Sequence, residues 1–74
     1  MMFLEPREQF DKAIVGVVSS CGAEDRLCYD AIKVVDALCD DGMNLDEAWE
    51  YFGFNIAGAY VGECTPVFLT ELVE

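Results

Sequence analysis

Residues 44–60, NLDEAWEYFGFNIAGAY, carry the clearest structural signal in this chain. Asn44, followed three residues later by Glu47, matches a capping box, in which each side chain bonds the other residue's backbone N–H at a helix start. Apolar residues then recur at helical spacing, and they are Leu45, Ala48, Trp49, Phe52, Ile56 and Ala59. The pattern predicts a helix over residues 45–60 that ends before Gly62.

Two side chains of this helix do not fit an ordinary buried stripe. On a helical wheel Asn55 falls at the margin of the buried face, where an unpaired amide costs about 1–3 kcal/mol. Phe54 falls opposite that face, and its neighbours there are Glu47, Glu50 and Tyr51. In one interpretation the first helix or the C-terminal strand covers Phe54 as ordinary core. In the other, Tyr51 and Phe54 form the apolar centre of an acid-ringed contact surface.

The segment before it predicts a second helix, over about residues 31–41. Asp30 stands where a capping side chain is needed, and Gly42 follows the last apolar position. The apolar stripe between them consists of Ile32, Val35, Leu38 and Cys39.

Two short apolar runs flank these helices and predict strands. Residues 26–29 are short enough to form a single edge strand, and residues 66–70 form a closing strand that Pro66 stiffens at its start. We expect Leu27–Tyr29 to pair with Val67–Leu69.

The N-terminal part of the chain allows two interpretations. A helix over about residues 6–20 is favoured, because Pro6 suits a first helical turn and apolar residues follow at helical spacing up to Cys21. The alternative is a strand over residues 13–19, since Val15, Val17 and Val18 are β-branched and glycine weakens a helix interior.

Together these elements predict an α+β fold of one domain, residues 1–74, that is mainly helical, with three helices and a small two-stranded sheet. The chain is 54% hydrophobic, which is too apolar for intrinsic disorder even at a net charge of −11. A domain this small buries roughly 60–65% of its unfolded surface, so self-association to a homodimer is left open.

The charge is strongly asymmetric along the chain. Lys33 is the last basic residue, and nine carboxylates follow it, whereas the first 33 residues hold six acids and four bases. Such a charge repels phosphate backbones and anionic membranes and attracts basic protein surfaces. We therefore expect no direct nucleic-acid binding and no membrane binding. The first residues are too acidic for a signal peptide, so we expect a cytoplasmic protein.

The acids of the two predicted helices converge around the Asp41-Gly42 turn, and they are Asp36, Asp40, Asp46, Glu47 and Glu50. As a calcium loop the turn fails, because Ala37 would stand where the first oxygen ligand is needed. The cluster is either a solvated face or a surface that imitates a line of phosphates and engages a basic patch. In the second case Tyr51 or Phe54 serves as the apolar anchor.

Catalytic and metal-binding signals are weak. The chain has no histidine, no serine in a G-x-S-x-G turn and no phosphate-cradling glycine loop. Its cysteines are Cys21, Cys28, Cys39 and Cys64, without a C-x-x-C pair. We expect all four to be reduced, with Cys21 and Cys39 in the helical core, although two disulfides or a four-thiolate metal site are alternatives. We expect no enzymatic activity, no metal and no cofactor.

Residues 50–68, EYFGFNIAGAYVGECTPVF, resemble the terminal segment of a group of small uncharacterised proteins from bacteriophages and prophages, which reads like Y-F-x-F-N-x-x-G-A-Y-V-G-E-x-T-P-x-F. The resemblance covers most of residues 10–69 and includes Ala13–Val17 and Tyr29-Asp30. It implies a phage or mobile-element origin and a host-cell cytoplasmic setting. It does not point to a particular activity. Where those relatives often have glycine or a polar residue before the Thr-Pro pair, this chain has Cys64.

The leading hypothesis is a small acidic phage-type protein that binds stoichiometrically to a basic surface of a host or defence protein, as a nucleic-acid mimic or inhibitor. The alternative is a homo-oligomeric accessory or structural phage protein, with Phe54 in the self-contact and no external basic partner.

Overall fold

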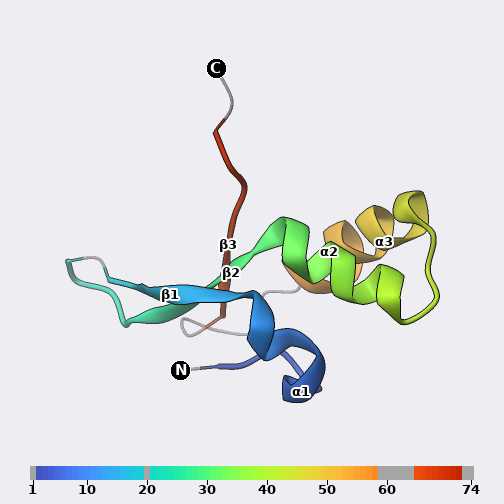
Figure 1. Ribbon diagram of the computed structural model, residues 1–74. Helices are drawn as coiled ribbons and strands as arrows, with labels where there is room; N and C mark the ends of the chain where they lie inside the picture. The colour runs from blue at the N-terminus through green and yellow to red at the C-terminus, as the bar shows by residue number, and fades with distance from the viewer. Residues whose placement is uncertain (1, 20, 59–64, 73–74) are drawn as a thin grey trace.

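A computed structural model gives the structure of this protein and describes residues 2–19, 21–58 and 65–72. Within these residues, three α-helices and a three-stranded sheet make up an α+β fold. The hairpin of β1 and β2 lies at one end, and α2 and α3 lie side by side at the other (Figure 1). None of the described helices is long and apolar enough to cross a membrane.

The prediction of a helix over residues 6–20 is wrong for most of that range. Helix α1 spans only Arg7–Phe10, a 3-10 turn η1 covers Asp11–Ala13, and strand β1 runs from Ile14 to Val18. The β-branched residues therefore form the strand that we considered as the alternative, because β2 supplies a partner for their backbone groups. Gly22 turns the chain between the two strands with a φ of 81°, which favours glycine.

The sheet has the order β1-β2-β3, so the predicted two-stranded sheet gains a third strand. Strand β2 (Arg26–Asp30) is antiparallel to β1 and parallel to β3 (Val67–Leu69). The predicted pairing of the segment Leu27–Tyr29 with Val67–Leu69 is confirmed. Cys28 lies opposite Val67, and Tyr29 lies opposite Phe68. The β2 strand is central, not an edge strand, and this position explains why its middle three residues are buried.

Helix α2 (Ala31–Asp40) begins and ends as predicted. The Asp30 carboxylate accepts the backbone N–H groups of Ile32 and Lys33 at 3.0 and 3.2 Å. At the other end Gly42, with a φ of 111°, donates to Cys39 O, and the next N–H donates to Leu38 O. This pair of bonds is a Schellman motif, which satisfies the last carbonyl groups of the helix.

Helix α3 (Leu45–Tyr51) begins with the predicted capping box, in which Glu47 N donates to Asn44 Oδ1 at 2.8 Å. After Tyr51 the helix widens into a π-helical segment, η2, over Phe52–Ala57. The predicted residues 59–60 and the stop at Gly62 lie outside the described part.

The core lies between α2, α3 and the inner face of the sheet. It contains Phe10, Ala13, Leu27, Tyr29, Ala31, Val34, Val35, Ala37, Leu38, Ala48 and Phe52. Leu45 and Trp49, which we predicted for the buried stripe of α3, are 59% and 41% exposed. Among the described residues of that stripe, Ala48 and Phe52 are buried and Ile56 is partly buried against the core.

The cysteine prediction is wrong for Cys21, which is exposed because it lies in the β1–β2 turn and not on a helix. Cys39 is half-buried against the core, and Cys28 on the central strand is buried. All three are free, while Cys64 lies outside the described residues.

The end of η2 provides a test of the helix geometry. A Cβ on Gly58 would lie 2.8 Å from the backbone O of Gly53, whereas a Cβ on Gly53 would meet nothing within 4 Å. We expect Gly58→Ala to lower the free energy of unfolding by about 1–3 kcal/mol. Gly53→Ala should leave it unchanged or raise it by about 0.5–1 kcal/mol. Urea denaturation of the two variants checks the difference, and equal stabilities would contradict the geometry of η2.

Candidate functional site

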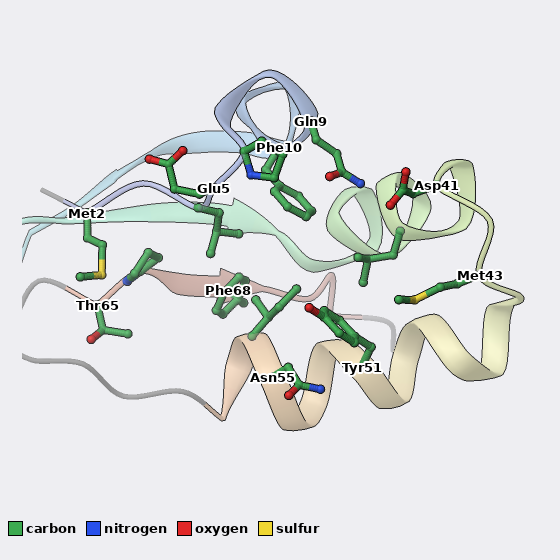
Figure 2. Close-up of a pocket in the computed structure, with 15 residues that line it drawn as sticks. Met2, Glu5, Gln9, Phe10, Asp41, Met43, Tyr51, Asn55, Thr65 and Phe68 are labelled. Atoms are coloured by element: carbon green, nitrogen blue, oxygen red, sulfur yellow. The ribbon is translucent and has the colours of Figure 1, made fainter.

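A cavity of about 330 Å³ opens between the N-terminal segment, the end of α2, the α3–η2 helix and the start of β3. Figure 2 shows Gln9 and Phe10 on one side of it, Tyr51 and Asn55 on the opposite side, and Phe68 between them. The wall is mostly apolar and is formed by Met2, Leu4, Pro6, Phe10, Leu38, Met43, Ile56, Pro66 and Phe68.

Hydrogen bonds hold the N-terminal wall of this cavity in place. The Gln9 side chain donates to Ala37 O at 3.2 Å, which ties α1 to α2. The backbone N–H of Leu4 donates to the Tyr29 hydroxyl at 2.8 Å, so a fully buried residue of the central strand anchors the segment before α1. The carboxylates of Glu5 and Asp41 also line the cavity.

A second hollow, of about 300 Å³, adjoins the first along α3 and η2. Its lining residues are Met43, Glu47, Glu50, Tyr51, Phe54 and Asn55. Met43, Tyr51 and Asn55 line both spaces, so the two hollows adjoin along these residues. We refer to the two hollows together as the α3 groove.

The π-helical turn determines which side chains border this groove. In a π-helix each backbone bond spans five residues, so successive residues rotate less about the axis than in an α-helix. Residues after Phe52 are therefore displaced from the positions that an α-helical wheel predicts. Asn55 becomes exposed instead of lying at the margin of the core, and it faces the groove.

The structure places four of the seven predicted contact residues around one hollow, namely Glu47, Glu50, Tyr51 and Phe54. Phe54 is 77% exposed and Tyr51 is 41% exposed, so the interpretation of Phe54 as ordinary core is wrong. Glu47 also closes the capping box through its contact with Asn44 N at 3.5 Å. Within the described part of the chain, neither Glu47 nor Glu50 forms an ion pair.

The other three predicted acids, Asp36, Asp40 and Asp46, line neither hollow of the groove. Asp40 pairs with Lys12, with 3.6 Å between Nζ and Oδ2, so a base does offset one of the C-terminal acids. Asp36 borders a different hollow together with Lys12 and Lys33. Asp46, in the first turn of α3, is exposed but lines neither part of the groove.

The sequence missed the opposite wall of the groove. Glu5, Met43 and Pro66 belong to segments far apart in the chain, and only folding brings them together. No local sequence pattern identifies Glu5 and Pro66 as lining residues. The positions of Asp41 and Met43 do follow from local sequence, because both residues flank Gly42 in the Schellman turn after α2.

The site has no metal centre that the structure can identify. Among the described residues, no three Cys, Asp or Glu side chains come together as metal ligands. Within the same residues, every buried side-chain N or O atom has a hydrogen-bond partner. The groove combines a mostly apolar lining with the carboxylates of Glu5, Asp41, Glu47 and Glu50.

Comparison of the chain with protein-family models, with curated proteins and with solved structures gave no match.

Proposed function

We propose that this protein acts by stoichiometric binding of a basic protein surface in the α3 groove. The observation that carries this proposal is the position of Phe54, which is 77% exposed at the edge of a hollow that also contains Glu47 and Glu50. An exposed aromatic side chain beside carboxylates that form no ion pair within the described residues combines an apolar anchor with a charged rim, as in most specific protein contacts.

The chemistry of the groove favours arginine or lysine in the partner. Both side chains have an apolar stem and a charged head, so the stem can follow an apolar wall while the head reaches a carboxylate. A guanidinium also stacks on aromatic faces such as those of Tyr51 and Phe54. Met43 lies at the junction of the two hollows, where its flexible side chain adapts to different occupants.

The charge of the whole chain supports the same kind of partner. At a net charge of −11, a basic surface is attracted from a distance, and the attraction raises the association rate. The resemblance of residues 10–69 to small phage proteins makes a host or defence protein in the host cytoplasm the natural candidate. A protein surface that ordinarily holds nucleic acid has the required charge, and this protein then acts as a mimic or inhibitor.

The alternative function is self-association through Phe54. The same carboxylates argue against it, because a two-fold contact centred on Phe54 would bring Glu47 and Glu50 of both copies together. Like charges in such a contact cost several kcal/mol.

The charge distribution provides a direct test with a matched control. Glu47→Gln with Glu50→Gln removes two charges from the groove, whereas Asp36→Asn with Asp40→Asn removes two charges beside Lys12 and Lys33. We expect the first pair to weaken binding of a fluorescein-labelled peptide of alternating arginine and leucine by about fivefold to tenfold. The second pair should change it by less than about twofold, because those acids already face bases.

Fluorescence anisotropy at low and high salt measures both effects. The loss should shrink as salt rises, since the screening length falls to about 8 Å at physiological ionic strength. If the two double variants bind the peptide equally, the groove acids have no special role and the proposal is wrong.

A further inference from the structure

The two hollows of the α3 groove are built from the same kinds of side chain. In the first, of about 330 Å³, the carboxylates of Glu5 and Asp41 lie beside the apolar wall. In the second, of about 300 Å³, the carboxylates of Glu47 and Glu50 lie beside Phe54. Among the described residues, no lysine or arginine lines either hollow, and none of these four acids forms an ion pair. Each hollow therefore combines apolar surface with negative charge that no base of its lining offsets.

The first hollow lies between walls from distant segments of the chain. Figure 2 shows Glu5 and Asp41 on either side of Phe10, along the wall that faces Tyr51 and Asn55. Glu5 and Asp41 are both exposed, so an incoming cation can reach them from solvent. A side chain that enters this hollow is flanked by apolar atoms and meets a carboxylate at the rim.

A long basic side chain matches this lining. The stem of arginine or lysine packs along an apolar wall while the charged head stays at the rim. The aromatic rings of Phe10, Tyr51 and Phe68, which line the first hollow, also suit stacking of a guanidinium. An anionic group would be repelled by the carboxylates, and an uncharged apolar side chain would leave them without a counter-charge.

The shared lining determines how close two occupants would be. Met43, Tyr51 and Asn55 line both hollows, so side chains that fill the two hollows lie next to one another. On the partner the two basic residues must then be near neighbours on one face. Residues two apart on a strand, or three or four apart on a helix, meet this requirement.

We propose that each hollow receives one basic side chain, so that the partner is recognised by a pair of neighbouring arginine or lysine residues. The inference rests on the proposed function, because it gives the second hollow the same role there. It adds the first hollow as a second cation site and specifies the spacing of the basic residues in the partner. Once one side chain is bound, the other is held at high effective concentration, so the two contacts reinforce each other.

Two fluorescein-labelled peptides of equal length test this pairing. One contains Arg-Leu-Arg, and in the other citrulline, which has an uncharged side chain of similar shape, replaces the second arginine. Three double variants of equal charge are compared by fluorescence anisotropy: Glu5→Gln with Asp41→Asn for the first hollow, Glu47→Gln with Glu50→Gln for the second, and Asp36→Asn with Asp40→Asn as the control.

We expect each hollow variant to weaken binding of the two-arginine peptide by at least about fivefold, and the control by less than about twofold. The one-arginine peptide should lose less than about twofold with either hollow variant, because its single arginine can occupy the other hollow. In the unmodified protein, the two-arginine peptide should shift the backbone N–H resonances of both hollows, at residues 9–10 and at residues 47 and 50.

The outcomes separate this inference from the proposed function. If Glu5→Gln with Asp41→Asn behaves like the control while Glu47→Gln with Glu50→Gln weakens binding, the inference is wrong and the proposed function stands. If neither hollow variant differs from the control, both are wrong. Equal losses for the two peptides with the first-hollow variant, or resonance shifts confined to one hollow, also overturn the inference.

Discussion

Replacing Phe52 by alanine is expected to lower the free energy of unfolding by about 3–5 kcal/mol, the range for a buried phenylalanine. Phe52 is 8% exposed and lies edge-on to Trp49 and Phe68, with ring centroids 5.8 and 5.0 Å apart. It therefore joins the α3–η2 helix to the last strand of the sheet. A domain has roughly 0.05–0.15 kcal/mol of stability per residue, so in a chain of 74 residues this loss leaves little.

Urea or thermal denaturation followed by circular dichroism measures this effect. We expect Phe52→Ala to be largely unfolded near body temperature, where the unmodified chain is folded. A loss below about 1 kcal/mol, the size of an ordinary surface effect, would show that η2 does not pack on β3 in this way.

Replacing Phe54 by alanine is expected to weaken binding and to leave the stability nearly unchanged, although Phe54 lies only two residues from Phe52. Its side chain is 77% exposed, so the free energy of unfolding should change by less than about 0.5 kcal/mol. If Phe54 is the apolar anchor of the α3 groove, its loss should weaken binding of the arginine-leucine peptide by about 2 kcal/mol, or about thirtyfold.

Leu45→Ala provides the matched control, because Leu45 is exposed on the same helix and lines neither hollow of the groove. It should leave the peptide affinity unchanged. Equal affinities for Phe54→Ala and Leu45→Ala would show that the exposed phenylalanine is not an anchor, and the proposed function would lose its principal support.

The helix termini show how much of the fold could be predicted from local sequence. The Asp30 cap, the turn at Gly42 and the Asn44–Glu47 capping box all form as the sequence predicts. Each depends on atoms within a few residues of one another, so the neighbouring sequence is sufficient to specify it. The exposed position of Phe54 agrees with the helical wheel, which left open whether another element covers this side chain.

The errors lie where distant segments compete with local preference. The sequence of residues 14–18 favoured a helix over a strand, and pairing with β2 made this segment a strand. The same choice moved Cys21 from an expected core helix to an exposed turn. Beyond Tyr51 the π-helical turn displaced Asn55 from the buried margin, which a regular wheel does not foresee.

In the candidate site, too, one part was predictable from local sequence and another part depended on distant segments. Glu47, Glu50, Tyr51 and Phe54 are close in sequence and on one helix, so their grouping was predictable. The ion pair of Asp40 with Lys12 was not predictable, because it depends on where α1 and η1 pack against α2.

By itself the sequence determined the acidic character of the chain, the caps of its central helices, the extent of α2, and the pairing of Leu27–Tyr29 with Val67–Leu69. Only the tertiary structure decided that a third strand joins the sheet, that Asp40 pairs with Lys12, and that a groove forms along α3. The physical reason is the distance along the sequence between the residues that make each contact. Caps and helical periodicity are set by contacts a few residues apart, whereas strand pairing, ion pairs between elements and the walls of a groove depend on which distant segments meet when the core closes.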